Sequence, residues 1–214
     1  AVPQHVFALL LQLTNHIQTY HQAVQQGAWS QSQQFCVHLQ PIEELAGKTM
    51  TVLGYGDLGQ ATARLAEAFG MRVLVAERPD AKEIRTGRTS FEDALRRADV
   101  LSLHCPLTEN TAQLINTKTL SFMKPKALLI NTARGGLIDE VALAEALLKG
   151  TLAGAALDVL STEPPAADHP LLQSAIPNLI ITPHVAWASR QAMQRLVVQL
   201  AENLQAFLAQ QPIR

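Results

Sequence analysis

From residue 48 onward, the sequence alternates between short apolar runs and segments with helical periodicity. The apolar runs show no regular polar alternation, and they lie at residues 50–53, 72–76, 100–104, 127–131, 153–158 and 179–182. Strands of this kind are buried on both faces, which is typical of a parallel sheet covered by helices. Helices are predicted between them, chiefly over residues 58–69, 91–98 and 140–149. The sequence therefore predicts an α/β fold with a parallel sheet of about six strands and helices on both faces.

Three glycines stand between the first predicted strand and the helix that follows it. Gly54 permits a tight turn, Gly56 lets the backbone approach a pyrophosphate, and Gly59 allows close packing of helix on strand. The amino terminus of the helix offers unpaired N–H groups and a partial positive charge to phosphates. The second predicted strand ends at Glu77, about twenty residues further on, as in dinucleotide-binding proteins. The pattern predicts a Rossmann-type, doubly wound sheet that binds a dinucleotide.

Glu77 bears on the choice of dinucleotide. A carboxylate at this place can accept hydrogen bonds from the hydroxyls of the adenosine ribose, and its charge repels a 2′-phosphate. This favours NAD over NADP. Arg78 leaves the preference open, since its guanidinium could stack on adenine or receive a phosphate. The structural alternative for Glu77 is an ordinary exposed carboxylate at a strand end.

Polar side chains follow three other predicted strands, at the edge where ligands bind in open α/β sheets. Arg134 follows residues 127–131, Asp158 ends the next strand with Glu163 five residues later, and His184 follows the last strand. Each of them alone has a structural explanation, such as a satisfied histidine after a proline or a solvated carboxylate. Together, at one edge of a sheet that binds a dinucleotide, they indicate catalysis.

These residue types suit the reversible reduction of a 2-oxo acid. Arg134 can hold the substrate carboxylate and carbonyl in a fork that lysine cannot reproduce. His184 can give a proton to the carbonyl oxygen as hydride arrives and take it back in the oxidation. Glu163, in contact with the imidazole, would fix its orientation and favour its protonated form.

The sequence resembles the NAD-binding domain of the D-isomer-specific 2-hydroxyacid dehydrogenases over essentially its whole length. The motifs that carry the resemblance are the glycine loop at 54–59, LHCPLT at 103–108, NTARGG at 131–136, ALDV at 156–159 and TPH at 182–184. The resemblance implies that Arg134, Glu163 and His184 are the catalytic trio. It implies an NAD site made of the three glycines and Glu77 together with Asp57, Leu58, Cys105, Pro106, Thr132, Ala133, Arg134, Asp158, His184 and Ala186. In that site Asp158 would bind the nicotinamide carboxamide.

The expected function is that of an oxidoreductase, transferring a hydride between NAD(H) and a small D-2-hydroxy acid or 2-oxo acid. Residues 160–165 and 184–189 look most like those of glycerate dehydrogenases, also called hydroxypyruvate reductases. An alternative from another class is a non-catalytic, NAD-responsive binding module of corepressor type. Rossmann enzymes of different chemistry, such as methyltransferases, do not call for the trio.

The first 42 residues contain no Asp, Glu, Lys or Arg. Apolar residues at helical spacing predict one helix from Pro3 to Gly27, and its uncharged surface indicates that it buries more than one face. We expect residues 1–42 to be an interdomain or dimer helix and arm, residues 43–187 the dinucleotide-binding domain, and residues 188–214 a last helix. A core helix within one compact domain is the alternative for the first segment. The resemblance further implies a homodimer and an additional N-terminal substrate lobe, without which NAD binding is expected to persist but catalysis to be impaired.

Composition excludes several classes of partner. Seventeen Lys+Arg balance eighteen Asp+Glu without a basic run, so no nucleic-acid partner is expected. The apolar runs are far shorter than the ~20 residues of a membrane span. Two cysteines, Cys36 and Cys105, and the lack of a signal-peptide pattern favour a cytoplasmic protein. No metal site is predicted, because the His and Cys residues lack ligand spacing. His104 and Cys105 face opposite ways on a strand and cannot form a nucleophile–base couple.

Overall fold

The computed structural model describes residues 1–173 and 176–211. Its centre is a six-stranded parallel sheet with the order β2-β1-β3-β4-β5-β6. The strands are β1 (Thr49–Leu53), β2 (Arg72–Ala76), β3 (Val100–Leu103), β4 (Leu128–Asn131), β5 (Gly154–Leu157) and β6 (Leu179–Ile181). The chain leaves β1 toward one edge and returns past it to build the other, which makes β1 and β3 the switch point of a doubly wound sheet. The predicted fold class is confirmed.

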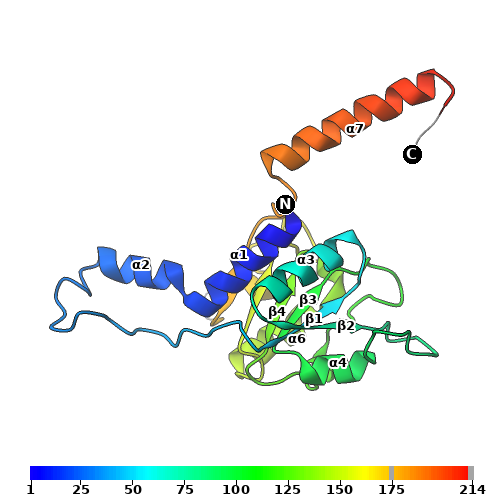
Figure 1. The fold of residues 1–214 in the computed structure, drawn as a ribbon. Coiled ribbons are helices and arrows are strands. Elements are labelled where there is room, and N and C mark those ends of the chain that lie inside the picture. The colour runs from blue at the N-terminus through cyan, green and yellow to red at the C-terminus, as the bar shows by residue number, and fades with distance from the viewer. Residues whose placement is uncertain (174–175, 212–214) are drawn as a thin grey trace.

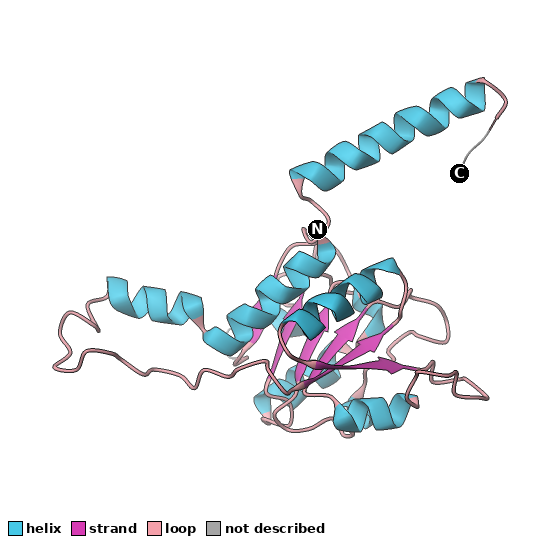
Figure 2. Ribbon diagram, viewed as in Figure 1, coloured by secondary structure: helices cyan, strands magenta, loops and turns pink. Residues whose placement is uncertain are grey.

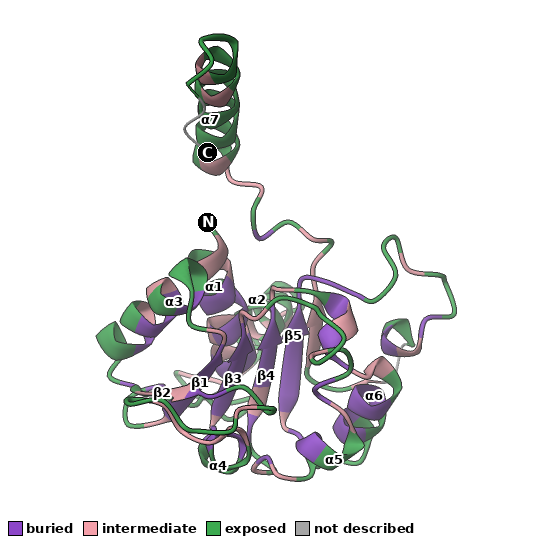
Figure 3. Ribbon diagram, turned by 90° about the vertical axis from the view of Figure 1, so that its right-hand side faces the viewer, coloured by how far each residue is buried: buried purple, intermediate pink, exposed green. Residues whose placement is uncertain are grey.

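Helices cover both faces of the sheet (Figure 2). On one face, α1 (Val2–Asn15) and α3 (Asp57–Ala68) bury an apolar cluster that includes Leu10 and Ala66. The rings of Phe7 and Phe69 stack there with centroids 5.1 Å apart. The second cluster fills the opposite face beneath α4 (Phe91–Arg97), α5 (Thr117–Leu120) and α6 (Glu140–Leu148). Figure 3 shows the strands buried between these two layers.

The first segment is not one helix, as the apolar spacing predicted, but two. α1 ends at Asn15, and α2 (Ile17–Gln25) begins after His16, whose φ of 51° is left-handed. Thr14 Oγ1 and Asn15 Nδ2 donate hydrogen bonds to carbonyl oxygens of the preceding turn, a local bonding that favours helix ends. The stripe of apolar residues continues across the break, which is why periodicity alone missed it.

The two helices differ in burial. α1 packs against the sheet and so forms part of the same core as the strands, whereas α2 has no buried residue. α2 and the following loop extend from the sheet as an arm (Figure 1). Within this arm Phe35 is 90% exposed.

The last helix, α7 (Arg190–Leu208), also stands away from the sheet (Figure 3). Its first turn is capped by Ser189, and its apolar stripe, including Leu200 and Phe207, is exposed. The end of the predicted last segment, residues 212–214, lies outside the described residues. Within the described residues, no helix combines the length and the apolar character needed to cross a bilayer.

Candidate functional site

All predicted site residues follow the carboxyl ends of strands. Most of them lie in loops, and Asp57, Leu58 and Gly59 lie in the first turn of α3 (Asp57–Ala68). Because every strand is parallel to its neighbours, these loops meet at one edge of the sheet. The glycine loop follows β1, Glu77 follows β2, Cys105 and Pro106 follow β3, Thr132, Ala133 and Arg134 follow β4, Asp158 and Glu163 follow β5, and His184 and Ala186 follow β6. The side chains on the β4–β6 loops therefore share an edge with the glycine loop.

The glycine loop is shaped by close backbone contacts. Gly54 has a φ of +93°, and a Cβ there would lie 2.5 Å from the backbone nitrogen of Cys105. A Cβ on Gly59 would lie 2.1 Å from the carbonyl oxygen of Gly54. A Cβ on Gly56, in contrast, would meet nothing within 4 Å. Gly54 and Gly59 are thus required by the fold, whereas Gly56 leaves open space in front of α3.

The open space suits a dinucleotide. Gly56 is the N-cap of the 12-residue helix α3 and offers no side chain to its first N–H groups. These groups can therefore bind an anion. On the other side of the switch point, Thr132 Oγ1 is buried and finds no hydrogen-bond partner among the residues that the structure describes. Both features call for a ligand with phosphate and hydroxyl or amide groups.

Glu77 is buried and surrounded by arginine. Its side chain is 1% exposed, and its carboxylate accepts hydrogen bonds from Arg85 Nε at 2.7 Å and from the Arg78 backbone N–H at 2.9 Å. Arg88 Nε lies 3.8 Å away. The hydrogen bonds from Arg85 hold the pKa of Glu77 far below its ordinary value, although burial opposes them. Glu77 is not the exposed carboxylate of the alternative interpretation, and Arg85 is a partner that no sequence pattern indicated.

Glu163 and His184 form a hydrogen-bonded pair. His184 Nδ1 lies 2.6 Å from Glu163 Oε2, and the N–H of Leu160 donates to Glu163 Oε1 at 2.9 Å. Burial alone would raise the pKa of Glu163, but hydrogen bonds from His184 and Leu160 outweigh it and lower that pKa. An ionised Glu163 can only accept, so the proton of the pair lies on Nδ1 of the imidazole. The two side chains remain open, His184 at 41% and Glu163 at 36% exposed.

A cavity of about 450 Å³ lies beside this pair. Its polar side chains include Asp158, Glu163 and His184, and its apolar lining comes from Leu160, Pro164, Pro165, Leu172, Ile181 and Pro183. A small hydroxy acid would fit a space of this size and mixed lining.

Asp158 holds the loop that carries His184. Its side chain is 1% exposed, and it accepts hydrogen bonds from the N–H groups of Val185 at 3.0 Å and Ala186 at 2.8 Å. Thr182 Oγ1 donates to the same carboxylate at 2.5 Å. His184 has a left-handed φ of 55°, which this anchoring sustains. The hydrogen bonds of Asp158 stabilise the loop that carries His184. The binding of the nicotinamide carboxamide by Asp158 stays a prediction.

His5 reaches the same loop from the first turn of α1. Its Nε2 lies 3.0 Å from Thr182 Oγ1 and 3.4 Å from Asp158 Oδ1. Because 177 positions separate His5 from Thr182, only the fold brings them together. Sequence reasoning missed this residue, and no local motif marks it.

Arg134 is exposed and donates to the carbonyl oxygen of Ala133 at 2.6 Å. Its charge also contributes to the lowered pKa of Glu163, after the larger effects of burial and hydrogen bonds. Arg134 therefore lies near enough to act on the pair. No direct hydrogen bond joins Arg134 to Glu163 or His184 within the part of the chain that the structure describes.

His104 and Cys105 do not form a reactive couple. Burial lowers the pKa of His104 to about 4 and raises the pKa of the Cys105 thiol. Nε2 of His104 lies 2.9 Å from Ser102 Oγ, within its own strand segment. Both residues support the glycine loop, since the Gly54 backbone packs directly on them.

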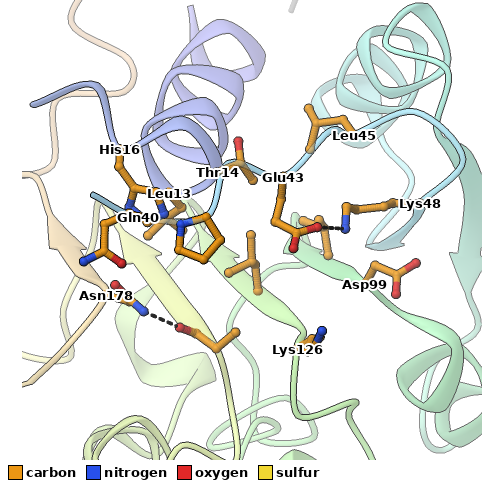
Figure 4. Close-up of a pocket in the computed structure, with 14 residues that line it drawn as sticks. Leu13, Thr14, His16, Gln40, Glu43, Leu45, Lys48, Asp99, Lys126 and Asn178 are labelled. Atoms are coloured by element: carbon orange, nitrogen blue, oxygen red, sulfur yellow. Dashed lines mark hydrogen bonds and ion pairs between the residues drawn. The ribbon is translucent and has the colours of Figure 1, made fainter. Parts of the chain in front are cut away.

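A different cavity, of about 420 Å³, opens at the opposite edge of the sheet (Figure 4). Residues that precede strands line it, among them Lys48, Lys126 and Asn178. Lys48 pairs with Glu43 at 2.8 Å, so opposite charges meet within the cavity wall. None of the predicted site residues lies there, and the candidate site is the carboxyl edge.

Comparison with known proteins identifies the family of the chain. Residues 7–186 match the family described as D-isomer specific 2-hydroxyacid dehydrogenase, NAD binding domain. A putative 2-hydroxyacid dehydrogenase of Haemophilus influenzae is 49% identical over 98% of this chain and 67% of its own length. A glycerate dehydrogenase of Methylorubrum extorquens is 46% identical over 99% of this chain and 66% of its own.

A solved structure gives the same result. The D-lactate dehydrogenase of Aquifex aeolicus, complexed with NAD and lactic acid, superposes with a TM-score of 0.81 at 31% identity, covering 98% of this chain and 66% of that one. The chain thus spans about two thirds of the length of the proteins it matches. NAD, expected from the glycine loop, is the cofactor of this domain family. The chain belongs to the D-isomer-specific 2-hydroxyacid dehydrogenases and forms their NAD-binding domain.

Proposed function

We propose that this chain is the cofactor-binding part of a dehydrogenase that interconverts a small D-2-hydroxy acid and its 2-oxo acid. The observation that carries the proposal is the Glu163–His184 pair, 2.6 Å apart, at the sheet edge that also holds the glycine loop. Bound NAD supplies the hydride acceptor, and NADH the donor. The chain's own residues then have to bind the cofactor, orient the acid and move one proton.

Cofactor binding falls to the β1 and β2 loops. The backbone at Gly56 and the amino terminus of α3 would receive the pyrophosphate, because open space lies in front of them. Glu77 would accept from the adenosine ribose, sharing its carboxylate with Arg85. Thr132 Oγ1 would gain the partner that it lacks.

Proton transfer falls to His184. With Nδ1 held by Glu163, the imidazole presents Nε2 as the atom that protonates the substrate carbonyl oxygen and recovers the proton in the oxidation. The hydrogen bond between Nδ1 and Glu163 fixes the orientation of that ring. Arg134 would orient the substrate by a forked contact with its carboxylate and carbonyl.

For the substrate we propose D-glycerate and hydroxypyruvate. Residues 160–165, whose sequence favoured this choice, line the cavity beside the pair at Leu160, Glu163, Pro164 and Pro165. The similarity to the glycerate dehydrogenase of Methylorubrum extorquens supports the same choice.

We propose three further properties. The isolated chain turns over slowly, because Glu163 and His184 are more than a third exposed and hydride transfer is favoured where water is excluded. Two copies associate as a homodimer through the N-terminal helix and arm, where Trp29 and Phe35 are exposed, together with the cofactor domain. The protein works in the cytoplasm, since Cys36 and Cys105 are both free thiols.

Steady-state assays test the proposal. NADH oxidation is followed with hydroxypyruvate, glyoxylate and pyruvate, using this chain and the full-length protein that contains it. The proposal expects the highest kcat/KM for hydroxypyruvate and faster turnover by the longer protein. NADH binding together with a change of oligomeric state, but no turnover of any 2-oxo acid by either protein, would instead support the corepressor-type alternative.

A further inference from the structure

The turn that carries Glu163 is held by a carboxylate that the proposed chemistry does not use. Glu140 is the first residue of α6, and its side chain is 10% exposed. Its Oε1 accepts a hydrogen bond from the backbone N–H of Ser161 at 2.7 Å, and its Oε2 accepts one from the Ser161 hydroxyl. Ser161 precedes Glu163 by two residues. Glu140 therefore restrains the backbone from which Glu163 projects.

Glu140 is restrained in turn by His169. The imidazole is 9% exposed, and its Nε2 lies 3.1 Å from Glu140 Oε2. Because Nδ1 accepts the N–H of Leu171 at 3.2 Å, the ring proton lies on Nε2 and is donated to Glu140. Two donors from Ser161 and one from His169 thus converge on this carboxylate. The site needs a group with two acceptor oxygens.

Gly135 packs against the same turn from the loop that follows β4. A Cβ on Gly135 would lie 1.9 Å from the carbonyl carbon of Leu160 and 2.3 Å from the nitrogen of Ser161. Leu160 also provides the N–H that donates to Glu163 at 2.9 Å. The backbone of Leu160 and Ser161 thus contacts Gly135 on one side and Glu140 on the other. A movement of this turn would displace the Leu160 N–H and with it the hydrogen bond to Glu163.

We propose that Glu140 is a positioning residue for the Glu163–His184 pair. Glu140 acts through Ser161 and Leu160, keeping the Glu163 carboxylate on Nδ1 of His184. When the turn is released, Glu163 turns toward solvent and loses both hydrogen bonds that hold its charge. The importance of Glu140 for catalysis rests on the proposed function of the Glu163–His184 pair. The effect of Glu140 on the ionisation of Glu163 can be measured without assuming that function.

The test is a Glu140→Gln substitution. Glutamine keeps the length and shape of the side chain, but it has one acceptor oxygen and places an NH₂ group against donors. The ionisation of Glu163 is followed by carbon NMR of its side-chain carboxyl in wild type and variant. We expect Glu163 to titrate at higher pH in the variant, closer to the ordinary pKa of glutamate, because hydrogen bonds from His184 and Leu160 weaken. NADH affinity, measured by calorimetry, is expected to stay within about twofold, since the glycine loop follows a different strand.

Glu145→Gln is the matched control. Glu145 lies on the same helix, but its carboxylate is 59% exposed and pairs with Lys149 at the surface. This control is expected to leave the titration of Glu163 unchanged. A folded Glu140→Gln chain in which Glu163 titrates as in wild type would overturn the proposal.

If Glu140→Gln fails to fold, a milder variant tests whether Glu140 affects the ionisation of Glu163. Ser161→Ala removes the hydroxyl donor and keeps the N–H bond to Glu140, so a smaller shift in the same direction is expected. No shift in this variant would also overturn the proposal. Failure of the wild-type chain to bind NADH would remove the proposed function but leave the titration comparison valid.

Discussion

The two halves of the site are built differently. On the side of β1 and β2, Gly54 and Gly59 are set by backbone contacts, and Glu77 is buried with its charge matched by Arg85. On the side of β4 to β6, Glu163 and His184 are side chains that remain more than a third exposed. The cofactor half is therefore formed by backbone contacts and buried charges within this chain. The substrate half depends on contacts that orient a few partly exposed side chains.

The largest expected effect is a loss of turnover in a His184 variant, which changes the substrate half and leaves the cofactor half in place. His184→Asn removes the proton donor but keeps a side chain of similar polarity, so the turnover of the full-length protein should fall by about 10²- to 10⁴-fold. NADH affinity should fall far less than turnover, because the glycine loop and Glu77 follow other strands. Stopped-flow and calorimetric measurements on the same protein check both expectations, and an equal loss in affinity and turnover would contradict them.

The second prediction concerns pH and the buried imidazole beneath the cofactor half. The pKa of His104 is about 4 in the folded chain, below the 6.5 of an unperturbed histidine. Above pH 6.5 His104 is neutral in both the folded and the unfolded chain, and its full contribution to stability is present. As the pH falls below 6.5, His104 is protonated in the unfolded chain before it is protonated in the folded chain. The free energy of unfolding therefore decreases between pH 6.5 and pH 4. The loss from this group amounts to about 3 kcal/mol.

Denaturant unfolding of wild type and His104→Gln checks this prediction. The variant should lose less stability than wild type between pH 7 and pH 4. Carboxylates such as Glu77 and Glu163 have lowered pKa values and add their losses at more acidic pH in both proteins. Parallel pH curves for the two proteins above pH 4 would show that His104 is not the cause.

The third prediction distinguishes glycines that the fold needs from the one that the ligand needs. In Gly56→Ala the added methyl group meets nothing within 4 Å, and the substitution should cost about 0.5–1 kcal/mol of stability, because alanine is a poorer N-cap than glycine. The added methyl group should nevertheless weaken NADH binding about 10- to 50-fold, because it occupies the approach to α3. Gly59→Ala serves for comparison and should destabilise the chain outright. Unchanged NADH affinity in a folded Gly56→Ala chain would place the pyrophosphate elsewhere.

The smallest expected effect tests the charge balance around Glu77. Arg85→Ala leaves the Glu77 carboxylate without its main partner, and the uncompensated charge should repel a 2′-phosphate more strongly. The preference for NADH over NADPH should therefore rise about three- to tenfold, as judged by calorimetry. Arg88→Ala is the control, since its Nε lies 3.8 Å from Glu77. A lower preference in Arg85→Ala would show that Arg85 instead helps Glu77 to select NADH.

Sequence reasoning recovered the fold because buried parallel strands leave a clear apolar signal. Residues 72–76 were predicted as the strand that the structure shows, and the other strands differ by a residue or two at their ends. Helix bounds such as those of α3 followed from the glycines on either side. The break at His16 and the short helix α5 were missed, because local hydrogen bonds rather than apolar periodicity determine them.

The site was predicted unevenly for a similar reason. Residues that follow strands, such as His184 and Asp158, could be assigned to one edge from the order of the strands alone. Partners that arrive from distant segments or buried loops could not, as with His5 on α1 and His169 against Glu140. Arg85 escaped notice because nothing in a surface loop rich in charge singles out one arginine.

Calorimetric titration shows whether the cofactor half of this chain binds NAD through a preformed loop and Glu77. Wild type and Glu77→Ala are each titrated with NADH and with NADPH. We expect wild type to bind NADH more tightly than NADPH, and the variant to lose this preference while still binding NADH. Failure of wild type to bind either nucleotide, or an unchanged preference in the variant, would contradict this expectation.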